Sequence, residues 1–308
     1  MIYYNDHFFE RFDVLFGKKS SIVAGEEYPL GYFAAEAMEL DAVFFKELKR
    51  LTQRASQEFD MFLTARTVSS AGMAIQELNR AWELVRQLPL YNKIPYRDGR
   101  GSSVSGVVRE LRSDEQKLDR MLTVGTAENE MLRRWHGMYD RLADDLKRFW
   151  YDTDDMLTDY FEELPSRRAE AYAAAYESCM ESFREIYMQT EDEEDLAYMN
   201  ERRLNFPVSI SFVVERDKKT GQPFMAERMT FEDLISFLYM DLYRGMAVGN
   251  VPRLCHNCGK WFLAIGAYDT VYCQRVAPGE MTRTCRQVGA HKKEREKNGK
   301  DFACREYA

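Results

Sequence analysis

The sequence predicts a mainly α-helical protein in two parts. These are an N-terminal acidic helical bundle domain over residues 1–204 and a small α+β lobe over residues 205–308, with a β-hairpin, a helix and a four-cysteine module. Apolar residues recur at intervals of three and four through most of the first part, as on one face of a helix. Proline (8) and glycine (17) are sparse among the 308 residues, which favours long helices over many turns. After residue 205 the pattern changes to short alternating runs and closely spaced cysteines.

The first part is expected to consist of helices that pack as a bundle. Residues 1–30 mix aromatic side chains with a Gly-Lys-Lys-Ser-Ser turn, and they predict only a short element followed by a loop. Beyond them, apolar periodicity and the positions of proline set the limits of each helix. The expected helices span residues 33–64, 70–88, 104–123, 127–163 and 166–189.

Two segments of this part are predicted to be exposed. Residues 97–106 could grip a phosphate, but they lack the Gly-x4-Gly-Lys-Ser/Thr pattern and no strand precedes them, so an inter-helix loop is favoured. Residues 191–195 are Glu-Asp-Glu-Glu-Asp, and charges this dense repel one another and stay solvated. We therefore expect a hinge or an exposed helix start there.

The lobe begins with an expected pair of strands. Residues 207–214 are β-branched and alternating, and residues 223–229 supply the return strand after a polar turn. Thr230-x-x-Asp233 then resembles a capping box at the start of a helix over 231–247. The cysteines follow this helix closely, so we expect their module to pack against it.

Four cysteines predict a metal site. Cys255, Cys258, Cys273 and Cys285 have the spacing C-x2-C-x14-C-x11-C, which fits a closed tetrahedral zinc site with four thiolate ligands. Gly259, directly after the second cysteine, frees the backbone to curl around the sulfur atoms. The sequence therefore predicts one structural Zn²⁺ in a zinc-finger module.

Three alternatives to this interpretation were considered. Disulfides are the main one, but the chain starts Met-Ile-Tyr-Tyr-Asn-Asp with no sign of a secretory signal, which favours a reducing cytoplasm and metal-bound thiolates. Catalytic zinc sites usually keep three protein ligands and an open position, so four cysteines favour a structural role. His256 lies between the first two cysteines and could replace one of them.

The charge distribution suggests a partner for the tail. Residues 251–308 hold 11 Lys+Arg and 6 Asp+Glu, whereas the whole chain carries −8, so residues 1–250 carry −13. A basic helix is expected after the fourth cysteine, and it could lie along a phosphate backbone of DNA or RNA. Mixed charge is also the usual pattern of a solvated helix face. The candidate nucleic-acid contacts are Arg286, Lys292, Lys293, Arg295 and Lys297.

The module also carries a family resemblance. The run Asp-Leu-Tyr-Arg-Gly-Met-Ala-Val-Gly-Asn-Val-Pro-Arg-Leu-Cys-His-Asn-Cys-Gly-Lys-Trp-Phe, followed by Tyr-Cys, Ala-Pro-Gly-Glu and Thr-Cys-Arg-Gln-Val-Gly-Ala, resembles domain-of-unknown-function family 6076, a bacterial family of the Firmicutes. The resemblance covers residues 235–291. More distantly, the module is similar to CGNR-type zinc fingers, which implies DNA binding. Here Cys285-Arg-Gln-Val stands in place of Cys-Gly-Asn-Arg.

Three classes of function were compared. A non-enzymatic protein that binds nucleic acid, or regulates, through its zinc module is favoured by the cysteines, the basic tail and the distant resemblance. A scaffold whose acidic helical body binds a protein partner, with purely structural zinc, is the alternative. An enzyme is not expected, because the chain has four histidines and lacks Gly-x-Ser-x-Gly, His-Glu-x-x-His and P-loop motifs. No apolar run approaches a membrane span, so a cytoplasmic protein is expected.

Overall fold

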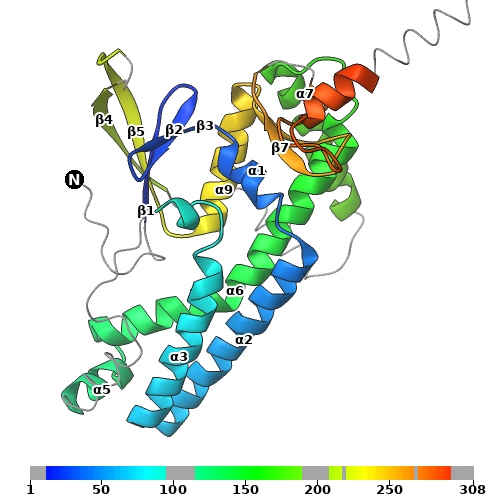
Figure 1. Ribbon diagram of the computed structural model, residues 1–308. Coiled ribbons are helices and arrows are strands. Elements are labelled where there is room, and N and C mark those ends of the chain that lie inside the picture. The colour runs from blue at the N-terminus through cyan, green and yellow to red at the C-terminus, as the bar shows by residue number, and fades with distance from the viewer. Residues whose placement is uncertain (1–11, 95–114, 189–207, 217–219, 267–269, 293–308) are drawn as a thin grey trace, which may run out of the picture.

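The structure is a computed structural model that describes residues 12–94, 115–188, 208–216, 220–266 and 270–292. Long helices form one end of the molecule, and a β-sheet and the cysteine module lie at the other end (Figure 1). The loop expected at 97–106 and the acidic run at 191–195 lie outside the described residues, as does the predicted domain boundary between residues 204 and 205.

The described N-terminal segment is β-structure, so the predicted fold class, with an N-terminal helical bundle, is wrong. Three short strands, β1 (Phe12–Phe16), β2 (Ser20–Val23) and β3 (Glu26–Pro29), follow one another as antiparallel neighbours. β1 also pairs with β5 (Pro223–Phe231), which in turn pairs with β4 (Ser209–Arg216). The result is a five-stranded antiparallel sheet in the order β3-β2-β1-β5-β4, built from both ends of the chain.

The error has a physical cause. Phe12, Val14 and Phe16 are buried on one face of β1, but so short an aromatic run fits a helix or a strand equally well. The segment is a strand because it pairs on both sides, with the nearby β2 and with the distant β5, where Phe12 lies opposite Phe231 and Asp13 accepts a hydrogen bond from Thr230 at 2.6 Å. Such a distant partner leaves no mark on the local sequence pattern.

The long helices lie near their predicted positions, with two interruptions. The expected continuous helix 33–64 is divided into two helices. Asp41 caps the second one, because its side chain accepts the Phe44 N–H at 2.8 Å. The expected helix 127–163 changes to π-helical geometry at Met156. The helices are α1 (Tyr32–Ala37), α2 (Ala42–Ala65), α3 (Val68–Val85), η1 (Tyr91–Lys93), α5 (Glu115–Leu122), α6 (Ala127–Asp155), η2 (Met156–Phe161) and α7 (Ala169–Met188).

The lobe contains the predicted hairpin and helix. β4 and β5 form the hairpin, and α9 (Leu234–Ala247) follows it with Asp233 as its N-cap, which accepts the Ser236 N–H at 2.7 Å. The expected capping box at Thr230 is wrong, because β5 continues through Phe231 and the Thr230 hydroxyl donates to Asp13. A second, two-stranded sheet consists of β6 (Val251–Leu254) and β7 (Trp261–Ala264). The cysteines surround this second hairpin.

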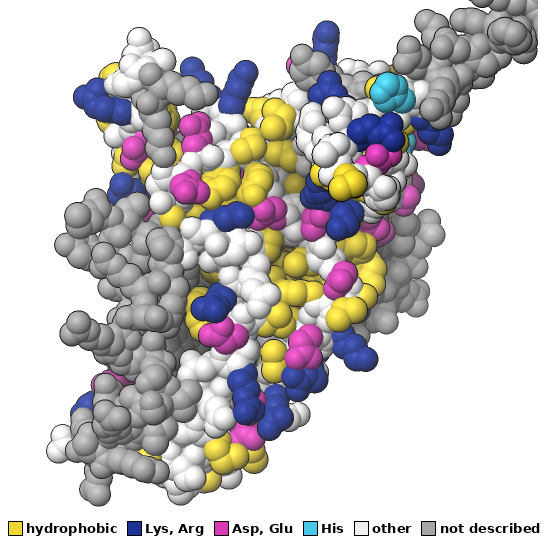
Figure 2. Space-filling model, viewed as in Figure 1, with side chains coloured by type: hydrophobic (Ala, Val, Ile, Leu, Met, Phe, Trp, Pro, Cys, Tyr) yellow, Lys and Arg dark blue, Asp and Glu magenta, His cyan; other side chains and the backbone are white. Residues whose placement is uncertain are grey.

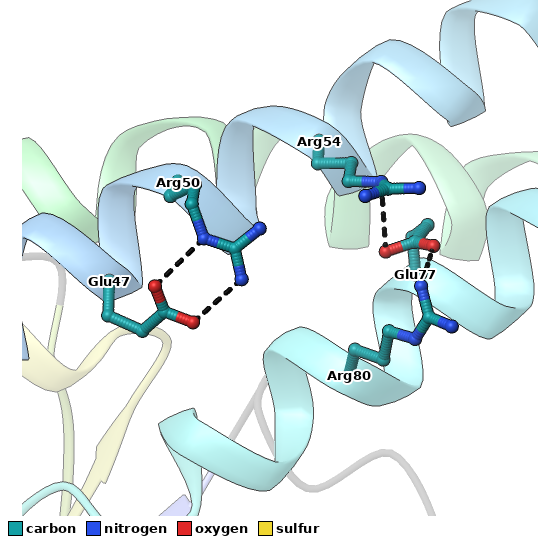
Figure 3. Close-up of polar contacts among 5 residues, drawn as sticks. All are labelled: Glu47, Arg50, Arg54, Glu77 and Arg80. Carbon is teal, nitrogen blue, oxygen red and sulfur yellow. Dashed lines mark hydrogen bonds and ion pairs between the residues drawn. The ribbon is translucent and has the colours of Figure 1, made fainter.

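Glu77 joins α2 to α3 through a nearly buried carboxylate. Its side chain is 7% exposed and lies between Arg54 of α2, at 3.3 Å, and Arg80 of its own helix (Figure 3). Glu47 pairs with Arg50 nearby, but that pair lies wholly on the exposed surface of α2. Both contacts are carboxylate–guanidinium ion pairs, but the Glu77 carboxylate is buried and the Glu47 carboxylate is exposed.

α1 is attached to α9 by a buried carboxylate. Asp241 of α9 is fully buried and accepts backbone N–H groups from Gly31, Phe33 and Ala34 at 3.0, 2.8 and 3.1 Å. These donors belong to the first turn of α1, where N–H groups have no partner within the helix. Burial raises the pKa of Asp241 to about 7, although the three N–H groups oppose that rise.

Two glycines allow the helices this close approach. A Cβ at Gly245 of α9 would lie 2.9 Å from the Cα of Gly31 and 2.7 Å from the carbonyl oxygen of Asn250. The Asn250 side chain donates to the Leu30 carbonyl at 3.0 Å and accepts the Gly266 N–H at 2.8 Å. This junction connects α1 and α9 to the β6–β7 hairpin, and so it positions the cysteine module.

Candidate metal centre

The first two cysteines lie on a tight turn between β6 and β7. The Cys255 N–H donates to the Lys260 carbonyl at 2.9 Å, and the Gly259 N–H donates back to the Cys255 carbonyl at 2.8 Å. Gly259 has a φ of 66°, a left-handed conformation that favours glycine. The turn therefore directs both thiols to the same side, as the sequence predicts.

The second pair of cysteines comes from a neighbouring loop and a helix start. Residues 285–292 are helical, and Cys285 is the first residue of that helix. The Cys285 N–H donates to the Arg275 carbonyl at 2.8 Å, and the Arg286 N–H donates to the Cys273 carbonyl at 3.0 Å. These backbone bonds hold Cys273 beside Cys285.

The four thiols converge on one point. All four Sγ atoms lie within 4.8 Å of one another, and the Sγ atoms of Cys258 and Cys273 are 3.7 Å apart. Thiolates bound tetrahedrally at about 2.3 Å from zinc are about 3.8 Å from one another, so the sulfur positions fit such a site. Cys255, Cys273 and Cys285 are buried, and Cys258 is partly buried. The cluster can hold a metal ion.

Two of the alternatives, a disulfide and His256 as a ligand, do not match this geometry. A disulfide needs sulfur atoms about 2.05 Å apart, and the described cysteines are all free thiols. His256 points away from the cluster toward the helical body, where its Nε2 lies 2.9 Å from Glu162 Oε1. The four cysteines are the candidate ligands.

The electrostatics of the thiols differ within the cluster. Burial disfavours the Cys255 thiolate, but backbone N–H groups of Cys273, Asn257 and Cys258 stabilise it and lower its pKa to about 6. Burial, together with hydrogen bonds among the thiols, raises the pKa of Cys273 to about 12. Burial also raises the pKa of Cys258. Four thiolates this close repel one another, so a cation is what allows them all to ionise.

The module is packed against the helical body. Trp261 and Val251 of its hairpin belong to the main hydrophobic core of the protein. Arg275 forms an ion pair with Glu39 at 2.7 Å. β6 also contacts α9, so the expectation that the module packs against the helix predicted at 231–247 is confirmed.

Only part of the predicted nucleic-acid interface can be located. Arg286 and Lys292 lie on the helix after Cys285, and both are exposed. Lys293, Arg295 and Lys297 lie outside the described residues. On the face shown in Figure 2, Lys and Arg side chains are interspersed with Asp and Glu and do not form a continuous basic area.

A serine–histidine contact occurs far from the cysteines. His136 of α6 lies 2.8 Å from Ser56 Oγ through its Nε2, and its ring stacks on Phe59. The carboxylate of Asp60 approaches the same Nε2, at 3.7 Å. A Ser-His-Asp triad needs its carboxylate on the other ring nitrogen, so this arrangement is not one.

Sequence reasoning missed the residues that place the module. Asp241, Asn250 and Glu39 carry the contacts described above. Asp241 and Asn250 lie in the run that carries the family resemblance, but no structural role was predicted for them, and Glu39 lies outside that run. The signal for Asp241 was available, because it is the one acidic residue within the apolar run 234–246.

The similarity to a known protein family lies within this lobe. Residues 203–308 match the family model of DUF6076, a family of unknown function. The predicted resemblance to this family is therefore confirmed, and the DUF6076 segment contains both the β4–β5 hairpin and all four cysteines. The match does not address the bacterial group or the similarity to CGNR-type fingers. No curated protein and no solved structure matches the chain.

A helix that crosses a membrane must be both long and apolar. Within the described ranges, every helix is too short or too polar to cross a bilayer.

Proposed function

We propose that this chain is a non-enzymatic protein in which the four cysteines of the DUF6076 segment bind one structural zinc ion. The observation that carries the proposal is the convergence of four largely buried Sγ atoms within 4.8 Å. Four protein ligands close a tetrahedral site, which leaves no open position for a substrate. Zinc is the metal that such a thiolate set selects most often.

The zinc ion would hold together two segments that are separate in the chain. Cys255 and Cys258 lie on the β6–β7 turn, and Cys285 begins the final described helix. Metal binding at such sites contributes on the order of 10 kcal/mol to the local fold. With these two segments joined by the metal ion, the surface of the module would keep one shape beside the helical body.

We further propose that the protein acts by binding a protein partner. Residues 1–250 carry a net charge of −13, which suits a basic partner. Two arginines of the module already pair with carboxylates, Arg275 with Glu39 and Arg283 with Glu280. These pairs lower the positive charge that the module can offer to a phosphate backbone.

Nucleic-acid binding is the second candidate, and it rests on the exposure of Arg286 and Lys292 beside the metal centre. A salt series with non-specific duplex DNA and single-stranded RNA separates the two candidates. The protein-partner proposal predicts no binding even at low salt. Binding that weakens steeply with salt, and that Arg286→Glu and Lys292→Glu abolish, would favour nucleic acid instead.

The zinc assignment has its own experiment. Purified protein is analysed for metal after each cysteine is replaced by serine in turn. We expect one zinc per chain in the wild type and its loss in Cys273→Ser and Cys285→Ser. Cys179→Ala is the matched control, because Cys179 is a buried cysteine of α7 outside the cluster. Zinc retained in Cys273→Ser or Cys285→Ser would show that the ligand set is wrong.

A further inference from the structure

β4 is an edge strand with an exposed apolar face. Among the strands that the structure describes, it is the last of the five-stranded sheet, so one of its sides has no described strand beside it. Ile210, Phe212 and Val214 share one face and are 53%, 67% and 64% exposed. Met225, opposite Val214 on β5, is 63% exposed and extends the same face. Large apolar side chains that gather in this way usually mark an interaction site.

The strand lacks the features that normally protect an edge. Natural edge strands are commonly guarded by charged side chains, proline or bulges. Residues 209–214 read Ser-Ile-Ser-Phe-Val-Val, and the first charged residue of β4 is Glu215. The pairing of β4 with β5 runs without a break from Ser209 to Arg216, so no bulge interrupts it. The open side of β4 is therefore a flat template for another strand.

The sequence of β4 is complementary to itself. In an antiparallel pair of two β4 strands related by a two-fold axis at Phe212, the two Phe212 side chains are opposite each other. Ile210 then lies opposite Val214 of the second copy, and Ser209 lies opposite Glu215. Apolar side chains meet only apolar side chains on this face, and no charge opposes a like charge.

We propose that β4 is a homodimer interface, in which two copies of this chain join their sheets by antiparallel β4–β4 pairing centred on Phe212. Two-fold pairing is closed, so it covers the β4 edge of each sheet and stops at two copies. The contact is a single strand pair, smaller than the roughly 1,200 Å² of a stable interface. The dimer therefore dissociates on dilution.

Sedimentation of the zinc-loaded full chain over a wide range of concentration tests the proposal. The expected result is a rise in mass from one chain toward twice that value as concentration increases. Phe212→Lys should remain a monomer throughout, since two lysines would meet at the axis, while position 212 is exposed in the monomer and the lysine can stay solvated. Val43→Lys, at an exposed valine of α2, should dimerise like the wild type.

Cross-linking tests the register. Residues opposite each other on the axis have Cα atoms close enough for a disulfide, so Phe212→Cys should give a covalent dimer on mild oxidation. Ser211→Cys is the matched control, because it faces the other side of the sheet and lies opposite Val213 of the second copy. Wild-type protein that stays monomeric, a Phe212→Lys variant that still dimerises, or equal cross-linking at both positions would overturn the proposal.

Discussion

Gly245→Ala tests the junction that positions the metal module. The added Cβ would lie 2.7 Å from the Asn250 carbonyl oxygen and 2.9 Å from the Cα of Gly31. Both are backbone atoms, so neither can rotate away as the end of a side chain could. The methyl group must therefore push α1 away from α9, or displace the start of the β6–β7 hairpin.

The size of the effect follows from two opposing contributions. Overpacking of a close contact costs about 1–3 kcal/mol, and contact with rigid backbone places this case near the upper limit. Alanine gains about 1 kcal/mol over glycine within a helix. We therefore expect Gly245→Ala to lower the free energy of unfolding by about 2 kcal/mol.

Gly137→Ala is the matched control for this prediction. Gly137 also lies within a helix, α6, but a Cβ there has no neighbour within 4 Å. We expect it to raise stability by up to about 1 kcal/mol. Urea unfolding of the zinc-loaded proteins, followed by circular dichroism, measures both. A Gly245→Ala protein as stable as Gly137→Ala would refute the close contact between α1 and α9.

Three further predictions concern other parts of the molecule. Gly289→Ala should weaken the metal module by about 1–3 kcal/mol, because its Cβ would lie 2.4 Å from the Tyr272 ring, and faster proteolysis of the C-terminal segment would report this. Glu77→Gln should cost about 1–2 kcal/mol, whereas Glu47→Gln at the exposed pair should leave the thermal unfolding transition almost unchanged; equal losses of stability would contradict the role of burial. The raised pKa of Asp241, about 7 in place of 3.8, means that its stabilising contribution is complete below about pH 4 and is lost as the pH rises through about 7. Asp241→Asn should lack this pH dependence, and an unchanged profile in chemical unfolding would show that another group causes it.

The sequence was sufficient for features whose signal is local. Four cysteines, two of them in a C-x2-C pair with a glycine after the second, identify the cluster without any knowledge of the fold, because this spacing is typical of zinc sites. The β4–β5 hairpin and α9 are likewise adjacent in the chain, so alternation and apolar periodicity predict them, although the capping box expected at Thr230 is not formed.

The remaining features depend on distant contacts. β1 is a strand because it pairs with β5, more than 200 residues away, as the bond between Asp13 and Thr230 shows. The attachment of α1 depends on Asp241 in the same way. Single-sequence periodicity cannot reveal such pairs, since each partner alone resembles an ordinary surface or core residue.

X-ray absorption spectroscopy of the purified protein tests the central claim most directly. The account predicts one zinc per chain with four sulfur ligands at about 2.3 Å. Cys285→Ser should abolish this spectrum, while Cys179→Ala should leave it unchanged. Zinc bound by nitrogen or oxygen together with fewer sulfur atoms, or wild-type protein that folds fully without metal, would contradict the account.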